Sequence, residues 1–396
     1  MRRALRFVPM LVLALAGCAE DEAVRFSAVV PLSGTAEIYG QAVRKGIELG
    51  FEELQAMKDL GYRIEFEVVD SASDPEQAKE LLANAINGGA LAVIGGITSE
   101  EAIHMVEVAD RYDRVLISPS ASTPQLTGIS KNFYRVFPSD SREGTTMGNF
   151  ASQKLQLGNV VILAKVDTYA KGIVEVFQAE FERNGGEVLD VIEYPPGAAD
   201  FTGLMERVET LVPQGVYVAA YAEDIGRIIS ELRTSGYEGR VLTTSAFAAP
   251  AAIEQIGDNA EGVFITQAGF DVTAEDERIA GFVKAFRDKY SLSPDLYAAH
   301  GYDTVMALAQ ALREGGPMPN DFWKSVRGLR DFTGVTGAIQ FDERGDVQKY
   351  PRVYVVEDGN LVDYEKEVEK RRQELLERLR RLEEAQRRRA LQGGGS

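Results

Sequence analysis

The chain has 396 residues, and its 61 acidic side chains outnumber its 43 basic ones, which leaves a net charge of −18. A surface with this excess of negative charge repels phosphate backbones, so nucleic acid is excluded as an expected partner. A single cysteine excludes an internal disulfide, and the length exceeds what one hydrophobic core usually organises, so we expect two lobes.

The N-terminal segment is predicted to be an export signal. Residues 1–17 place arginines before a short apolar run and end in small residues directly before Cys18, the sole cysteine. The order Leu-Ala-Gly-Cys resembles the lipobox of bacterial lipoproteins. This resemblance implies that Cys18 is acylated and that its lipid anchors the chain to the extracytoplasmic face of a membrane in the cell envelope. Residues 18–23 would form the lipidated linker to the folded body. The alternative is an ordinary signal peptide with an incidental cysteine.

From residue 24 onward, short β-branched runs alternate with amphipathic stretches of helical spacing. The predicted strands include residues 26–30, 63–69, 92–95, 115–118, 160–165, 187–193, 215–219 and 240–243, and the predicted helices include residues 40–59, 75–87, 100–112, 170–184, 202–211 and 224–235. Strict alternation of this kind predicts an α/β fold in which helices cover both faces of parallel sheets. A ligand would then lie beyond the carboxyl ends of the strands, where residues 31–40, 97–101 and 118–124 form loops.

The loop at residues 97–101 has two possible roles. It stands at a strand-to-helix junction, where free backbone N–H groups and the positive end of the helix favour a bound carboxylate. Thr98 and Glu101 also have the spacing of a capping box, in which the side chains satisfy those donors themselves. Spacing alone favours the cap.

The C-terminal segment differs from the rest of the chain. Val368, Leu375 and Leu382 are spaced by seven, and Leu379 lies between the last two in a stretch dense with Glu and Arg. This pattern predicts a charged helix over residues 365–391 with a narrow apolar stripe, followed by a disordered end at residues 392–396. The helix is either a short coiled coil that binds a partner or a solvated helix that packs lightly on the body.

Signals for enzymatic chemistry are missing from the sequence. The two histidines, His104 and His300, belong to no cluster with metal-ligand spacing, and neither a nucleophile elbow nor a phosphate-binding glycine motif is present. We therefore expect a protein that is not an enzyme and that needs no metal or cofactor.

Six segments in chain order resemble signatures of the leucine/isoleucine/valine-binding protein family. They are Pro31-Leu32-Ser33-Gly34 with Tyr39-Gly40, Ile117-Ser118-Pro119-Ser120-Ala121-Ser122-Thr123-Pro124, and residues 167–172, 297–303, 332–337 and 341–346. The likeness covers about residues 24–363. It implies a type I periplasmic binding protein, whose two doubly wound lobes close on a small molecule and present it to an ABC transporter permease.

The resemblance also implies where the lobes divide. The first lobe would comprise residues 24–138 and 267–349, and the second residues 139–266 and 350–364. Three crossing strands would join them, near residues 135–140, 262–266 and 348–353. Closure about these crossings is the expected motion.

The same alignment implies a set of ligand contacts. The family holds an amino acid's α-carboxylate through hydroxyl and N–H donors, and here those positions are Ser99, the backbone at Ala121, and Ser122. Aromatic residues that line or close the cleft in the family fall at Tyr39, Tyr169 and Tyr221. The apolar part of the ligand would rest on Tyr39, Tyr169 and Phe247.

One position departs from the family pattern. Where amino-acid binders usually place a carboxylate for the ligand's ammonium, the alignment has Ala246. A buried ammonium without a counter-charge is costly, so another acid would have to replace it, for which Glu223, Asp224 and Asp200 are candidates. The expected ligand is therefore a small amino acid, a carboxylate or an amide.

Two other functions remain open from sequence. A sensory lipoprotein would use the same cleft but pass its closure to a receptor protein. An envelope scaffold would keep the fold with a degenerate cleft and use the C-terminal helix to contact a partner.

Overall fold

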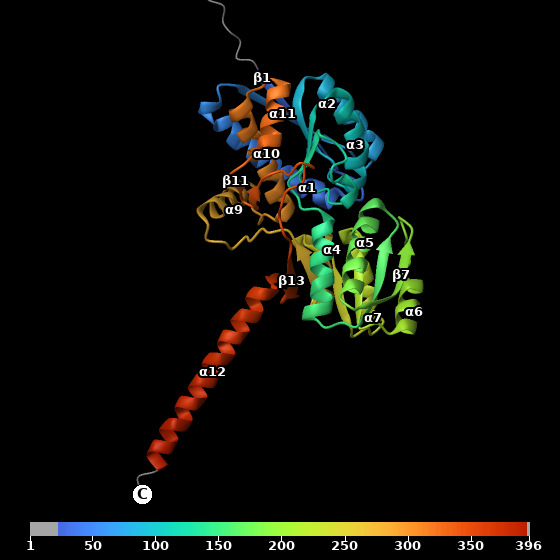
Figure 1. The fold of residues 1–396 in the computed structure, drawn as a ribbon, viewed down its shortest axis with the longest axis vertical. Coiled ribbons are helices and arrows are strands. Elements are labelled where there is room, and N and C mark those ends of the chain that lie inside the picture. Colours follow the sequence, from blue (N-terminus) through green and yellow to red (C-terminus); the bar gives the residue numbers. More distant parts are fainter. Residues whose placement is uncertain (1–22, 394–396) are drawn as a thin grey trace, which may run out of the picture.

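The computed structural model of the protein describes residues 23–393, with side chains through residue 386. The predicted signal and Cys18 lie outside the described residues, as does the end of the chain from residue 394. Two α/β lobes lie one above the other, and a long helix leaves the lower lobe (Figure 1). Among the described helices, none combines the length and the apolar character needed to span a bilayer.

The first lobe is built on a five-stranded parallel sheet with the strand order β2-β1-β3-β4-β5. Its strands are β1 (Ala23–Val30), β2 (Arg63–Asp70), β3 (Ala90–Gly95), β4 (Val115–Ser118) and β5 (Phe133–Arg135). Its helices are α1 (Glu37–Ala56), α2 (Pro75–Asn87), α3 (Ser99–Tyr112), α9 (Glu277–Tyr290), α10 (Leu296–Gly315) and α11 (Pro319–Gly328). Alternate residues of β3 point to opposite faces, so Ala92 and Ile94 pack in the cluster that holds α1 and α10, whereas Val93 packs with α2 and α3.

The second lobe is built on a seven-stranded sheet with the order β14-β13-β10-β9-β8-β6-β7. Its strands are β6 (Asn159–Lys165), β7 (Glu187–Tyr194), β8 (Gly215–Ala219), β9 (Arg240–Thr243), β10 (Phe264–Gln267), β13 (Arg352–Glu357) and β14 (Asn360–Asp363), and its helices are α4 (Asp140–Asn149), α5 (Thr168–Arg183), α6 (Thr202–Leu211), α7 (Ala222–Thr234) and α8 (Pro250–Ile256). The strands from β7 to β10 are parallel, and β13 and β14 add an antiparallel edge. The predicted α/β fold with two parallel-sheet lobes is confirmed.

Short elements connect these units. They are the small antiparallel pair β11 (Phe332–Gly334) and β12 (Gly337–Ile339), the 3-10 turns Lys58–Leu60, Pro124–Leu126, Ser245–Phe247 and Gly257–Ala260, and a π-helical turn at Phe150–Lys154. The chain passes between the lobes three times: after β5, after β10 and before β13.

A buried ion pair ties the first of these crossings to the segment that leads into the third. Arg135, at the end of β5, is fully buried, and its Nε and Nη2 donate to the two carboxylate oxygens of Asp346 at 2.7 and 2.9 Å. Its Nη1 donates to the carbonyl of Thr123 at 2.9 Å. The guanidinium therefore also holds the loop after β4.

A second buried cation, Lys349, lies just before the third crossing. Its Nζ donates to the hydroxyl of Thr336, and the Asp303 carboxylate accepts from the backbone N–H groups of Val335 and Thr336 at 2.7 and 2.8 Å. Burial lowers the pKa of Lys349 from 10.5 to about 8, against the opposing pull of the Asp303 charge.

We expect this lysine to make the protein more stable as the pH rises above 8. Between pH 8 and 10.5 the unfolded chain keeps the Lys349 proton and the folded chain releases it, so the free energy of unfolding increases with pH. Each pH unit in this window contributes up to about 1.4 kcal/mol. Urea unfolding at pH 8.0 and 9.5 should show a rise in the wild type that is absent from Lys349→Met. An equal pH dependence in both proteins would contradict the assignment.

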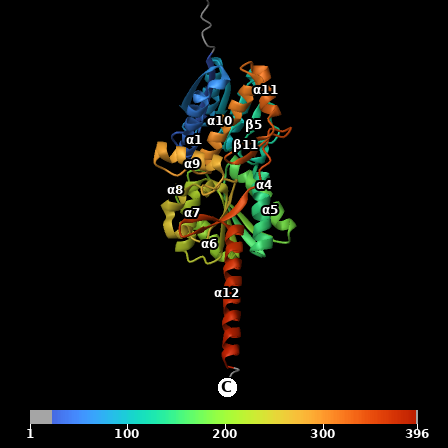
Figure 2. The same cartoon turned by 90° about the vertical axis from the view of Figure 1, so that its left-hand side faces the viewer.

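The helix α12 (Tyr364–Gly393) follows β14 and extends into solvent (Figures 1 and 2). Its root is fixed, because the Tyr364 ring packs edge-on against Phe150 at a centroid distance of 4.9 Å and Lys366 pairs with Asp271 at 2.7 Å. Arg371 pairs with Glu357 of β13 at 2.8 Å. Beyond Arg371, no ion pair or hydrogen bond joins the described side chains of α12 to the body.

Candidate functional site

A small cavity lies between the lobes, beyond the carboxyl ends of strands from both sheets. Its volume is about 30 Å³, which is room for one or two water molecules. Its walls come from segments that follow β3, β4, β5, β8 and β9, and from the first turns of α1, α5 and α10. The lining residues are Tyr39, Ile97, Thr98, Ser99, Ser120, Ser122, Phe137, Tyr169, Tyr221, Ser245, Ala246 and Tyr297.

The structure brings most of the predicted contact residues to this cavity. Those on its wall are Tyr39, Ser99, Ser122, Tyr169, Tyr221 and Ala246. Ala121 and Phe247 do not line it. The Ala121 N–H donates to the Ser118 hydroxyl at 2.9 Å, so this donor is already used. Phe247 is fully buried in the hydrophobic core, because the 3-10 turn that places Ala246 on the wall points the next side chain into the core.

Other lining residues were not singled out from sequence. Tyr297 belongs to one of the recognised segments, and its position in the first turn of α10, after the Asp295 cap, could have marked it as a residue at the cleft. Ser120 also belongs to a recognised segment, the one at residues 117–124. Phe137 and Ser245 carried no signal of their own, since their place depends on how the lobes pack.

The hydroxyl of Ser99 is oriented by its neighbours. It accepts from the Thr123 N–H at 3.2 Å, which leaves its own O–H free to donate. The capping box favoured by the spacing is present, because Thr98 Oγ1 accepts from the Glu101 N–H at 3.2 Å and Glu101 Oε2 accepts from the Thr98 N–H at 3.1 Å. Two donors at this helix end are therefore already satisfied, and the Ser99 hydroxyl is one of the donors that remain.

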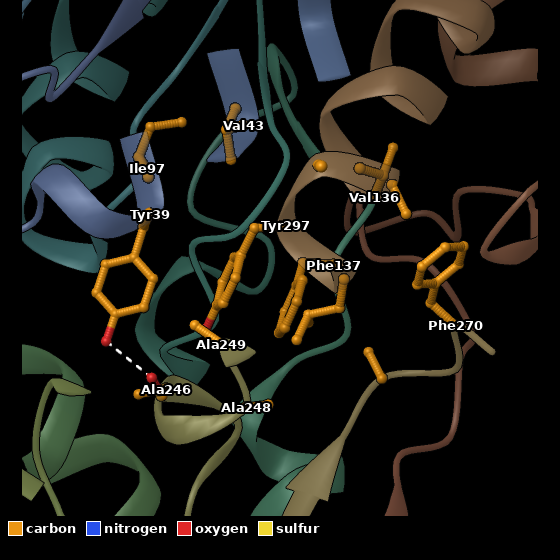
Figure 3. Packing of buried hydrophobic residues seen from close by; sticks show 14 of the residues in the cluster. Tyr39, Val43, Ile97, Val136, Phe137, Ala246, Ala248, Ala249, Phe270 and Tyr297 are labelled. Carbon is orange, nitrogen blue, oxygen red and sulfur yellow. Dashed lines mark hydrogen bonds between the residues drawn. The ribbon is translucent and has the colours of Figure 1, made fainter. Parts of the chain in front are cut away.

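Two tyrosines of the first lobe bond across the cleft to the second lobe. The Tyr39 hydroxyl donates to the Ala246 carbonyl at 2.9 Å and accepts from the Ala222 N–H at 2.8 Å. The Tyr297 hydroxyl donates to the Ser245 carbonyl at 3.0 Å. Figure 3 shows both rings reaching from the first lobe toward the turn that carries Ala246. These bonds hold the described conformation closed.

The tyrosines also form a continuous aromatic cluster. The Tyr39 ring lies 4.9 Å from that of Tyr297 and 5.8 Å from that of Tyr221, and Tyr221 stacks on Tyr169 at 5.3 Å. Burial raises the pKa of all four phenols above the usual value, so they stay neutral and act as hydrogen-bonding groups with a large apolar surface.

Two buried acids on α4 stand directly behind the cavity wall. The Glu143 carboxylate accepts from the N–H and hydroxyl of Ser245 at 2.6 and 2.8 Å and from the Thr266 hydroxyl at 2.6 Å. The N–H of Asp140 donates to the Ser122 carbonyl at 2.8 Å. Burial raises the pKa of both carboxyl groups, and the charge of Glu143 raises that of Asp140 further.

The acids named from sequence as replacements at Ala246 do not line the cavity. Asp224 pairs with Lys165 at 3.1 Å, Asp200 accepts from Thr202 at the start of α6, and Glu223 is exposed. Glu143, an acid not named from sequence, bonds instead to Ser245, the residue next to Ala246.

An open groove leads from the surface to the cavity. Its volume is about 650 Å³, and it shares Thr98, Tyr169 and Tyr221 with the cavity wall. Glu100 lines this mouth and accepts from the Thr168 hydroxyl of the other lobe. The negative charge of Glu100 therefore lies at the entrance. Within the described residues, no group of three His, Cys, Asp or Glu side chains is placed to hold a metal ion.

Comparisons with known proteins agree with this architecture. The family model described as periplasmic binding protein matches residues 23–360. The leucine-, isoleucine-, valine-, threonine- and alanine-binding protein of Pseudomonas aeruginosa is 22% identical over 332 residues, which is 83% of this chain and 88% of the relative. The Leu/Ile/Val-binding protein of Escherichia coli is 23% identical over 86% of this chain and 92% of its own.

Solved structures give the same answer. A leucine binding protein from Thermotoga maritima superposes with a TM-score of 0.81 at 28% identity, covering 86% of this chain and 97% of that one. A branched-chain amino acid transporter substrate binding protein from Streptococcus pneumoniae, in complex with isoleucine, superposes with a TM-score of 0.81 at 26% identity and covers 86% and 98%. The chain therefore belongs to the periplasmic binding protein family and has the type I fold of the solute-binding proteins of ABC transporters.

Proposed function

We propose that this protein closes its two lobes on a small amino acid, carboxylate or amide and delivers it to an ABC transporter permease while a lipid on Cys18 holds it at the membrane. The observation that carries the proposal is the cavity itself. Hydroxyl groups of Ser99 and Ser122 on the first lobe face Tyr169 and Tyr221 on the second, at the carboxyl ends of parallel strands.

The first-lobe wall suits an anionic or carbonyl oxygen. Ser99 is the first residue of α3, where the helix end favours negative charge, and its O–H is free to donate. Hydrogen bonds from such donors to a carboxylate are charge-assisted and therefore stronger than neutral ones. We propose that the ligand's carboxylate or amide oxygen binds here.

The second-lobe wall determines whether the cleft can accept a ligand that carries an ammonium. Ala246 offers no charge, and Glu143, the acid that bonds to the adjacent Ser245, already accepts three hydrogen bonds. An amino acid would have to draw on this carboxylate through a rearrangement of Ser245, whereas a carboxylate or amide without an ammonium needs no such change. The relatives named as binders of branched-chain amino acids support the first class, and the Ala246 wall supports the second.

Solute entry requires the lobes to separate. A cavity of about 30 Å³ is far below the several hundred Å³ of usual ligand sites, and the four tyrosines fill the space between the lobes. Opening would break the bonds that Tyr39 and Tyr297 make to the second lobe, and the three crossings would act as the hinge.

A thermal-shift screen of the chain from residue 19 onward tests the proposal. We expect a stabilising ligand among amino acids, simple and aromatic carboxylates, and amides, because a ligand at a hundred times its dissociation constant adds about 2.7 kcal/mol to the free energy of unfolding. A response to leucine or isoleucine would mean that a buried acid such as Glu143 pairs with the ammonium. No response from any of these classes would contradict solute binding and favour the scaffold function.

The sensory alternative uses the same cleft, so the screen does not separate it from transport. Uptake of the identified solute by cells that lack this protein provides that distinction. Loss of uptake supports delivery to a permease, and unchanged uptake contradicts it.

A further inference from the structure

We propose that α12 pairs in parallel with α12 of a second copy of this chain, so that the protein is a dimer joined by a two-stranded coiled coil. The helix extends into solvent beyond its root (Figures 1 and 2). It nevertheless carries a row of apolar side chains. Those side chains are exposed by 43–57%: Val368, Leu375, Leu376, Leu379 and Leu382. A row of this kind on a soluble protein marks an interaction surface.

The spacing of the row is that of a coiled-coil seam. Val368, Leu375 and Leu382 repeat every seven residues, and Leu379 occupies the alternating core position between the last two. Arg372 occupies the preceding core position, where a polar residue lowers stability but helps to fix the register. The seam is therefore short, and we expect a dimer that dissociates on dilution.

The seam faces away from the protein's own body. After Tyr364, the α12 residues that line the groove of about 910 Å³ between the helix root and the second lobe are Glu365, Lys366, Glu369, Lys370 and Gln373. Successive helical residues turn by about 100°, so the seam formed by Leu375, Leu379 and Leu382 lies on average about 140° round the helix from these residues. Beyond Arg371, no ion pair or hydrogen bond joins the described side chains of α12 to the body. A second helix can reach the seam without meeting the body of the first copy.

Charges beside the seam favour a second copy in the parallel orientation. In a parallel coiled coil, the residue just before a core position such as Leu379 lies beside the residue five places later on the partner helix. Here these two residues are Arg378 and Glu383, so Arg378 of each copy would pair with Glu383 of the other. In the antiparallel register that matches Leu375 with Leu379, the two Arg378 side chains would instead lie side by side. Both residues are exposed and no ion pair of the described chain uses either of them.

Sedimentation velocity of the chain from residue 19 onward, over a concentration series, tests the pairing. We expect a reversible dimer in the wild type. Arg378→Glu and Glu383→Arg should each weaken it by roughly tenfold, because each change turns two attractive contacts into repulsive ones. The double variant should restore it, because the charges are then exchanged.

The neighbouring residue provides the matched control. Glu384→Arg makes the same change of charge one position away, on the outward face of the helix, and should leave the dimer unaffected. Circular dichroism should show equal helix content in all variants. A wild type that stays monomeric at all concentrations would overturn the proposal, as would a dimer that the double variant does not restore. Neither result depends on whether the cleft binds a solute.

Discussion

Replacing Asp346 with alanine is expected to lower the free energy of unfolding by about 3–5 kcal/mol, because it leaves the buried Arg135 guanidinium without its counter-charge. Arg135 is 0% exposed and makes two hydrogen bonds to Asp346, at 2.7 and 2.9 Å. Urea unfolding at pH 7, read by circular dichroism, measures the change.

A double variant separates the ion pair from simple packing. Arg135→Met with Asp346→Leu removes both charges and keeps apolar volume, so most of the lost stability should return. If Asp346→Ala changed the free energy of unfolding by less than about 1 kcal/mol, or if the double variant were as unstable as the single one, the ion pair would not have the role assigned to it.

Removal of both first-lobe hydroxyls, in Ser99→Ala with Ser122→Ala, should reduce the affinity for the solute at least about hundredfold. Each charge-assisted hydrogen bond contributes about 1.5–3 kcal/mol, and two of them would be lost. Calorimetric titration of the ligand found in the screen measures the loss, and the melting temperature of the variant shows that it is folded.

Ser120→Ala is the matched control for this double variant. Ser120 lines the same cavity, but its hydroxyl donates to the Ile97 carbonyl at 2.6 Å and is not available to a ligand. We expect its affinity to change by less than about tenfold. Full affinity in the double variant would place the ligand elsewhere.

Local signals explain which elements could be predicted from sequence. The predicted bounds of α2 match the structure, because Asp74 caps the helix by accepting from two backbone N–H groups and Pro75 opens it. The start of α1 was placed at Gly40, whereas the helix begins at Glu37, because its N-cap residue, Ala36, offers no side-chain acceptor that marks the boundary.

Some residues of the candidate site could likewise be predicted from sequence, and others could not. Ser99 and Ser122 lie in the loops and first helical turn just beyond β3 and β4, so their place at the cleft follows from the alternation of strands and helices. The buried acids Asp140 and Glu143 could not be placed, because their depth depends on how α4 packs against α5, β10 and β13 in the second lobe. Tyr297 likewise reaches the cleft only because α10 packs along α1 far away in the sequence.

The distance between the two lobes tests most directly whether they close on a solute. The chain from residue 19 onward contains no cysteine, so spin labels at Glu80→Cys on α2 and Glu175→Cys on α5, both exposed positions, report the distance between the lobes when the labelled protein is diluted with unlabelled protein. Double electron–electron resonance should show a longer or broader distance distribution without solute, and a shorter, narrower one when the solute saturates the cleft. Identical distributions with and without the bound solute would contradict lobe closure.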